Sequence, residues 1–250
     1  MELKQEAENS DQFVKIEEYN SLMQEFTDFI YTVSHDLNSP MRHIREFNKL
    51  LVRSLGDRIN EDEKKYVFYV EDGVRRAENI LAGLLEYSRI NTRAKPFTEI
   101  NTNKIIEDVK IRLKSQISES STKINVNPLP PLFGDYEQVL QVFLHIIDNA
   151  IKFTNHDINP EINIFGAQND YKCIFSVKDN GIGIAKDQQE NVFNLFKRLD
   201  NNLNKQGVGI GLTICKKIIK RHNGEIWIES EPDIGTTVYF SFCSRKKLTN

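Results

Sequence analysis

The 250-residue chain is poor in cysteine, with only Cys173, Cys215 and Cys243, and their spacing matches no metal-ligand motif. Such an odd, scattered set predicts reduced thiols rather than a disulfide framework. The chain also lacks an apolar run long enough to span a membrane, and its first residues lack the basic and apolar regions of a secretory signal. We therefore expect a cytoplasmic chain without a membrane segment.

An excess of basic residues is missing too, since 33 lysines and arginines stand against 36 acidic residues, for a formal net charge of −3. Nucleic-acid binders carry basic surfaces, so we expect no nucleic-acid partner. The charge is unevenly placed, because residues 1–35 hold eight acidic residues and two lysines. The acidic start of the chain therefore differs in kind from the remaining residues.

A seven-residue repeat of apolar residues runs from residue 16 to residue 51. Five heptads with one seam predict a long helix that packs against other helices. Pro40 is the one exception to the apolar pattern, and a proline inside a helix predicts a bend there. The a and d positions are Ile16, Tyr19, Met23, Phe26, Ile30, Val33, Leu37, Pro40, Ile44, Phe47 and Leu51.

A second helix is predicted over residues 61–90, with Asn60 as its N-cap. The connecting segment contains Gly56, so the two helices should form an antiparallel hairpin. One hairpin makes a poor core, and two hairpins from two chains make a four-helix bundle, so we expect a homodimer. The apolar repeat of the second helix is Val67, Val70, Val74, Ala77, Leu81 and Leu84.

His35 occupies heptad position f, which points away from the seam into solvent. Asp36 beside it has no lysine or arginine three or four residues away, so no local ion pair explains it. Taken alone, an ordinary surface histidine beside a bent helix is the simpler interpretation of this pair.

From about Phe97 the pattern changes to alternating strands and helices, with the boundary at residues 91–96. Helices on one face of a largely antiparallel sheet predict an α+β sandwich. Asn101 and Asp135 are the expected N-caps of two of its helices, and residues 127–135 read as a proline-rich loop. The expected strands are 97–100, 123–126, 161–168, 173–179, 225–230 and 236–242, and the expected helices are 104–117, 135–153, 187–196 and one from near residue 209.

Two glycine clusters, residues 179–184 and 207–212, flank a polar loop at residues 200–207. Glycines let backbone N–H groups approach a ligand closely, and a helix N-terminus favours phosphate. A single cluster would fit plain turns, but two clusters around one loop predict two walls and a lid. The P-loop motif is absent, and the second cluster does not follow a strand, so neither a P-loop nor a Rossmann site is expected.

Asn149 and Lys152 add polar groups to the apolar helix over residues 135–153. An amide oxygen suits Mg²⁺ and a lysine suits phosphate. A helix end with a lysine placed favourably on its dipole explains these two residues equally well.

Together these segments resemble the two-component sensor histidine kinases. Residues 34–40 (SHDLNSP) look like their phosphoacceptor box, and residues 145–154 look like the N box. Residues 179–184 and 207–212 look like the two glycine boxes, Phe193 and Phe196 like the F box, and residues 235–237 like the last small box. The boxes occur in the family's order, and the resemblance covers residues 20–243.

The resemblance implies a helical-hairpin domain that dimerises, followed by an ATP-binding domain of the GHKL (Bergerat) sandwich type. The implied division is a signalling helix over 1–20, a phosphotransfer domain over 21–95 and an ATP-binding domain over 96–245. His35 would accept the γ-phosphoryl of ATP with Asp36 as general base, and the group would pass to an aspartate of a response regulator. Asp179 would bind the adenine amino group, Phe153 would pack on adenine, Asn149 would hold Mg²⁺ and Lys152 would contact phosphate. The remaining implied ATP-site residues are Gly181, Gly183, Ile184, Phe196, Gly207, Gly209, Gly211, Leu212 and Thr236.

Two residues depart from the family pattern, and the length of the lid points to a subgroup of the family. His145 stands where the N box begins with asparagine, so it would reach the metal only through a water. Ser39 stands where threonine or asparagine supports phosphatase action, and it keeps a hydroxyl. The lid is short, as in the phytochrome-like kinases. Two alternatives stay open: a dimeric scaffold that binds nucleotide without transfer, and an ATPase of the gyrase and chaperone superfamily.

Overall fold

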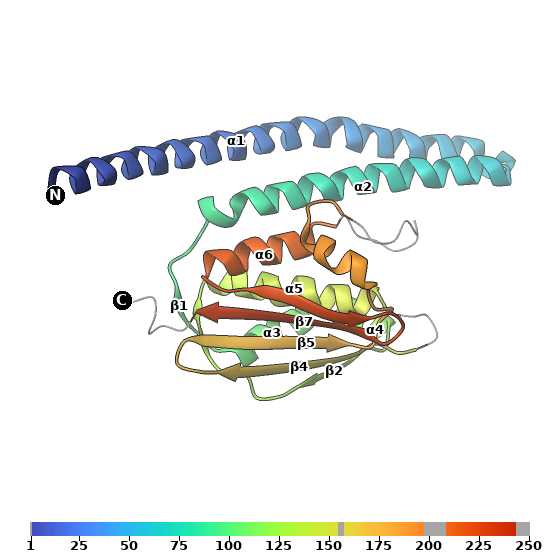
Figure 1. The fold of residues 1–250 in the computed structure, drawn as a ribbon. Helices are drawn as coiled ribbons and strands as arrows, with labels where there is room; N and C mark the ends of the chain where they lie inside the picture. The colour runs from blue at the N-terminus through green and yellow to red at the C-terminus, as the bar shows by residue number, and fades with distance from the viewer. Residues whose placement is uncertain (1, 155–157, 198–208, 244–250) are drawn as a thin grey trace. The chain divides into compact units, whose positions relative to one another are not determined.

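The computed structural model describes residues 2–154, 158–197 and 209–243, with side chains described for Glu18 and from Ser21 onward. The chain divides into two compact units, Met1–Thr92 and Arg93–Asn250, both of which are drawn in Figure 1. No helix in the described ranges is long and apolar enough to cross a membrane.

The first unit is the predicted hairpin of two helices, α1 (Glu2–Leu55) and α2 (Glu61–Thr92), joined by a short 3₁₀ turn, η1 (Gly56–Arg58). Asn60 caps α2 as predicted. Its side-chain oxygen accepts from the Glu63 N–H at 2.9 Å, and Glu63 accepts in return from the Asn60 N–H at 2.7 Å. α1 continues through Pro40, and Figure 1 draws it as one gently curved helix without a sharp break.

The two helices pack through Met41 of α1 and the α2 cluster of Val74, Ala77 and Leu81. Arg45 and Glu78 form an ion pair at 3.0 Å across the hairpin. Of the predicted seam, Ile30 is buried, but most of the other a and d side chains are not, so α2 covers a different face of α1. Ile16 and Tyr19 lie outside the described side chains. The large exposed seam residues are Phe26, Leu37, Ile44, Phe47 and Leu51.

The second unit is built on a five-stranded sheet in the order β2-β4-β5-β7-β6. β2 and β4 are parallel and all other neighbours are antiparallel. A separate two-stranded sheet pairs β1 (Thr98–Ile100) with β3 (Leu132–Gly134). The sequence pattern did not predict β3, because this strand follows a run of prolines and three residues are too few to show an alternating pattern. The main strands are β2 Lys123–Val126, β4 Glu161–Gln168, β5 Lys172–Asp179, β6 Ile226–Glu231 and β7 Gly235–Cys243.

The helices of this unit are α3 (Thr102–Arg112), α4 (Lys114–Glu119), α5 (Tyr136–Lys152) and α6 (Gly211–Arg221). The side chains of Asn101 and Asp135 cap α3 and α5 as predicted. The expected single helix over 104–117 is wrong, because the backbone leaves helical geometry at Leu113, whose side chain is buried. The helix expected from near residue 209 starts two residues later, at Gly211.

The segment expected as a helix over 187–196 is instead a 3₁₀ segment, η2 (Lys186–Phe193). Only Val192 within it is buried, so amphipathic packing contributes little to its shape. The side chain of Gln189 donates to the carbonyl oxygens of Ile184 at 2.9 Å and Ser230 at 2.8 Å. These tertiary bonds tie η2 to β6 and hold it in a tighter turn than an α-helix.

The core of this unit lies between the sheet and helices α5 and α6, which lie together along one face of the sheet in Figure 1. Alternate strand residues point inward, as in an antiparallel sheet with one buried face. Four fully buried phenylalanines, one on α5 and three on β5 and β7, meet edge to face or stacked at 5.0–6.1 Å between ring centroids. The expected class, a helical hairpin followed by an α+β sandwich, is confirmed. The four rings are Phe143, Phe175, Phe240 and Phe242.

His222, at the end of α6, is buried in this core in its neutral form. Its ring stacks on Phe97 at 4.4 Å, its Nδ1–H donates to the Ile218 carbonyl at 2.8 Å, and its Nε2 accepts from the Asp135 N–H at 3.0 Å. Because His222 Nε2 already accepts a hydrogen bond from the Asp135 N–H, this nitrogen cannot take up a proton without breaking that bond. Burial, with a smaller contribution from Arg221, therefore lowers the pKa of His222 to about 4.

We expect acid to destabilise the second unit through His222. An unfolded histidine takes up a proton below about pH 6.5, whereas the folded one resists until about pH 4, so the stabilisation is complete above pH 6.5 and is lost as the pH falls toward 4. The loss should reach about 3 kcal/mol. Urea unfolding of the full chain across this pH range measures it, and His222→Gln should flatten the pH dependence. The exposed His43→Gln serves as control; an equally steep curve in His222→Gln would contradict the assignment.

Candidate functional site

His35 and Asp36 lie together on the outer surface of α1, with side chains 78% and 71% exposed. His35 Nδ1 and Asp36 Oδ1 are 3.1 Å apart. A carboxylate can only accept, so Nδ1 carries the proton in this contact and Nε2 keeps its lone pair toward solvent. Ser39, one turn further along α1, is also exposed. The exposure predicted from heptad position f is confirmed.

Asn149, Lys152 and Phe153 lie at the C-terminal end of α5, on the part of the helix that the core leaves uncovered. Asn149 is half-buried and Lys152 is exposed, while the apolar face of α5 is packed against the sheet. The Lys152 ammonium contacts the Asp148 carboxylate. The helix therefore presents an amide and a salt-bridged lysine side by side at one end.

Asp179, at the end of β5, is the half-buried acid of this region. Its Oδ1 accepts from the backbone N–H of Gly181 at 2.8 Å and of Thr236 at 2.9 Å. Burial raises the pKa of Asp179, and the two backbone donors oppose that rise. The carboxylate thus joins the first glycine cluster to the start of β7.

The first glycine cluster is also fastened to α5 and to the β6–β7 turn. The Phe153 carbonyl accepts from the Ile182 N–H at 2.9 Å, and a Cβ on Gly181 would lie 2.6 Å from the same oxygen. Gly183 has φ +68°, and a Cβ there would lie 2.0 Å from the Glu231 carbonyl oxygen. Only glycine fits such a left-handed, closely packed position.

Ser230 joins the first glycine cluster to the start of β7, and the sequence reasoning missed it. Its hydroxyl accepts from the Ile184 N–H at 2.8 Å, donates to the Gly235 carbonyl at 2.9 Å and lies 2.8 Å from the Thr236 hydroxyl. A serine in a strand carries no sequence signal of this role, because its partners come from two other segments.

The second glycine cluster lies at the N-terminus of α6, and Ile210 gives that helix no side-chain cap. Gly209 has φ +73° and packs on the Lys197 carbonyl. A Cβ on Gly211 would lie 3.3 Å from His145 Nδ1, so the altered N-box residue lies against this cluster. Gly207 and the loop at 200–207 lie outside the described residues.

Phe193 and Phe196, the expected F box, precede that undescribed stretch. The Phe193 carbonyl accepts from the Thr213 hydroxyl at 3.0 Å, which ties the F box to α6. Phe196 has φ +59° and is exposed. Leu212 lies in the first turn of α6 beside Gly211 and is half-buried.

The donor set around α5 is too sparse to hold a metal ion alone. Within the described ranges, no group of three or more His, Cys, Asp or Glu residues gathers as a metal site. Mg²⁺ usually keeps several waters and binds through one or two protein oxygens together with substrate phosphates. The Asn149 amide oxygen fits that pattern, so the residues suit a magnesium ion that arrives with a nucleotide.

Two family models match the chain. Residues 27–93 match the His Kinase A (phospho-acceptor) domain, and residues 134–246 match the histidine kinase-, DNA gyrase B- and HSP90-like ATPase domain. The first match contains His35 and the second contains both glycine clusters. The chain therefore belongs to the sensor histidine kinases.

Relatives and solved structures agree with this assignment. The phytochrome-like protein Cph1 of Synechocystis is 36% identical over 213 residues, which cover 85% of this chain and 28% of that protein. The catalytic domain of histidine kinase ThkA is 28% identical with a TM-score of 0.52, over 60% of this chain and 99% of that one. ThkA in complex with response regulator TrrA shares the fold, with 24% identity and a TM-score of 0.61 over 90% of this chain and 65% of that one. The chain spans 26–29% of the length of four curated relatives.

We expect Gly183→Ala to destabilise the second unit by about 3 kcal/mol or more, because it combines a left-handed backbone with a clash against Glu231. Thermal and urea unfolding of the full chain provide the measurement. Gly73→Ala makes the same chemical change in α2, where nothing lies within 4 Å of the added carbon, and should leave the second unit unchanged. Equal stability of the two variants would show that the cluster tolerates side chains.

Proposed function

We propose that the chain is an ATP-dependent protein-histidine kinase that phosphorylates His35. The observation that carries this proposal is the exposed His35–Asp36 pair on a helical hairpin, in the same chain as a glycine-rich fold of the histidine kinase ATPase type. A surface histidine alone would not need such a partner domain.

The acceptor chemistry follows from the hydrogen bond to Asp36. With the proton on Nδ1, the Nε2 lone pair of His35 attacks the γ-phosphorus of ATP. A new N–P bond forms, the bond from the γ-phosphorus to the bridging oxygen breaks, and ADP leaves with that electron pair. The ring becomes positively charged as it attacks, and Asp36 stabilises this charge and accepts the Nδ1 proton as general base.

The adenine is bound at Asp179. Both backbone donors reach Oδ1, so the second carboxylate oxygen can accept from the adenine amino group. An oxygen in place of that amino group, as in guanine, would face the carboxylate, so the site selects adenine. Phe153 packs on the base. The cluster residues Gly181, Gly183 and Ile184, together with Thr236, line the pocket.

The phosphates are bound between α5 and the N-terminus of α6. The first turn of α6 has no side-chain cap, so its backbone N–H groups can bind phosphate oxygens, which Gly209 and Gly211 let approach closely. The sequence motif implies the same role for Gly207. Lys152 reaches the phosphates after leaving Asp148. Asn149 would hold Mg²⁺, with His145 acting through a water, and the ion would supply positive charge against the phosphates. Phe196 and Leu212 border the phosphate end of the site.

The first unit forms a homodimer through the uncovered heptad seam. Phe26, Leu37, Ile44, Phe47 and Leu51 are 43–69% exposed, and apolar rows of this length need a covering helix. A second hairpin supplies that cover and completes a four-helix bundle. We assign residues 21–95 to this dimerisation and phosphotransfer domain, 96–245 to the ATP-binding domain and 1–20 to a signalling helix.

The phosphoryl group passes from His35 to an aspartate of a response regulator. The exposure of the pair supports this step, because a receiver domain must reach the same nitrogen that ATP reaches. The solved complex of the similar kinase ThkA is with a response regulator. Ser39, one turn away, offers a hydroxyl for positioning water in the reverse, phosphatase direction.

We expect γ-labelled ATP to label the full chain with an acid-labile, base-stable phosphate, and His35→Gln to lose it completely, because the nucleophile is gone. His43→Gln, an exposed histidine eight residues further along α1, should label like the wild type. Bound ATP without label would favour a non-catalytic scaffold. Free phosphate without label would favour an ATPase.

We expect Asn149→Asp to lose labelling by at least about a hundredfold, because a carboxylate beside the triphosphate and Asp148 changes both charge and metal geometry. The dimer should survive, since Asn149 lies in the second unit, and light scattering measures its mass. Wild-type labelling in this variant would refute the metal assignment; loss of the dimer would show instead that the variant is misfolded.

A further inference from the structure

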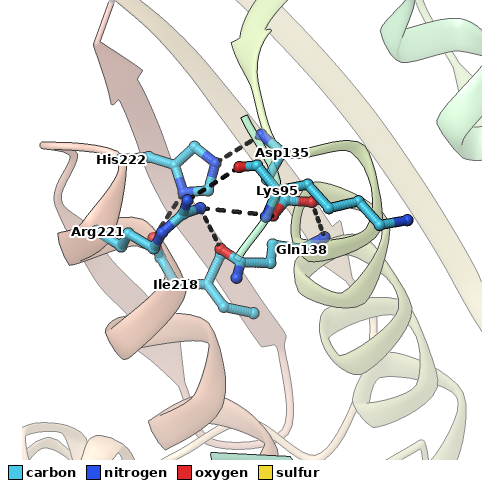
Figure 2. A network of polar contacts seen from close by, with 6 residues as sticks. All are labelled: Lys95, Asp135, Gln138, Ile218, Arg221 and His222. Carbon is cyan, nitrogen blue, oxygen red and sulfur yellow. Dashed lines mark hydrogen bonds and ion pairs between the residues drawn. The ribbon is translucent and has the colours of Figure 1, made fainter. Parts of the chain in front are cut away.

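The first residues of the second unit are held at both backbone groups of Lys95. The Lys95 N–H donates to the Asp135 carboxylate at 2.7 Å, and the Lys95 carbonyl accepts from Arg221 Nη2 at 3.1 Å. Figure 2 shows both contacts. Pro96 follows and fixes its own φ, which stiffens the segment further. A connecting segment would ordinarily leave such groups to water.

Arg221 makes more contacts here than a surface arginine does. Its Nη1 donates to the Gln138 side chain at 2.8 Å and lies 3.6 Å from Asp135 Oδ2. Its guanidinium lies 4.6 Å above the ring of Phe97, two residues beyond Lys95. One side chain therefore holds the connecting segment by a backbone bond and by its first aromatic ring.

The base of this arrangement is buried and rigid. Asp135 is 1% exposed and is the N-cap of α5, and its N–H is bonded to His222, which ends α6. The segment is thus attached where the start of α5 meets the end of α6 (Figure 2). We call the set Lys95, Phe97, Asp135, Gln138, Arg221 and His222 the linker clamp.

The linker clamp shortens the free connection between the two units. α2 ends at Thr92, so only Arg93 and Ala94 lie between it and the held Lys95. Three Cα steps span at most about 10 Å. Without the clamp, the first held residue is Thr98 of β1, paired with Gly134, and six steps span about 21 Å.

The attachment also lies at a fixed distance from the proposed phosphate site. Along α5, Asn149 is about 20 Å from the first turn, and along α6, Gly211 is about 15 Å from Arg221. Both helices thus act as rigid spacers between the linker and the bound triphosphate.

We propose that Arg221 is a positioning residue for phosphoryl transfer: by holding Lys95 it keeps the tether short and so raises the rate at which bound ATP meets His35. This inference rests on the proposed kinase function. For a flexible tether, effective concentration falls roughly as the −3/2 power of length, so doubling the free length lowers the encounter about threefold.

The test uses the full chain and separates ATP binding from transfer. Arg221→Ala, which leaves the bond from Lys95 to Asp135 in place, should leave ATP affinity unchanged and lower the first-order labelling rate at saturating ATP by up to about threefold. Lys123→Ala, which loses a surface ion pair with Glu161 between β2 and β4, should change neither. An unlabelled wild type would defeat the kinase proposal itself. A labelled wild type with an unchanged rate in Arg221→Ala, or with equal losses in affinity and rate, would overturn the positioning role.

A second variant keeps the test valid if Arg221→Ala is unstable. Inserting Gly-Ser-Gly between Arg93 and Ala94 lengthens the tether with every clamp residue intact, and should also slow transfer about threefold. The variant that carries both changes should label less than twofold more slowly than either single variant, because loss of the clamp then lengthens a tether that is already long. If the rate losses of the two single variants multiplied in the double variant, or if the insertion left the rate unchanged, tether length would not be the cause of both.

Discussion

The proposed nucleotide site depends on one half-buried carboxylate. Asp179 ends β5, and its Oδ1 accepts from two backbone N–H groups that belong to different segments, Gly181 and Thr236. Removing a buried charge from water is costly unless donors replace the water, and here the backbone supplies them. The same bonds fix the path of the first glycine cluster and the start of β7. The carboxylate that we propose to select adenine therefore also fixes the backbone around it, so a substitution there should affect both nucleotide binding and local folding.

The sequence was informative where a signal is local or periodic. Both hairpin helices, the caps at Asn60 and Asp135 and the alternation of β4 and β5 follow from heptad spacing, capping chemistry and period-two patterns. It was uninformative where a shape comes from distant partners. The Gln189 side chain ties η2 to β6, β3 forms by pairing with β1, and α2 meets α1 at Met41, which lies outside the predicted seam.

The candidate site divides in the same way. His35, Asp179 and the glycines stand out because their residue types are unusual for their positions: a solvent-facing histidine beside an acid that has no lysine or arginine one helical turn away, and glycines in clusters. Ser230 and Arg221 are ordinary residues at ordinary places, a strand serine and the basic last turn of a helix. Their roles come from side chains that reach segments 5 to 126 residues away, which no local pattern encodes.

The proposed acceptor and the proposed nucleotide site belong to separate units, and this separation has a physical consequence. In the proposed reaction His35 receives a phosphoryl group and gives it up again, so it cannot be enclosed with ATP in a single permanent pocket. Water would compete in an open site, and transfer therefore depends on how often the two parts meet correctly oriented. In our proposal these meetings are governed by the connection, in which only Arg93 and Ala94 lie between α2 and the clamp on α5 and α6. In such an arrangement the binding site sets whether ATP is held, while the linker sets how often it is used, so a signal acting on the hairpin can change the rate of transfer without changing the affinity for nucleotide.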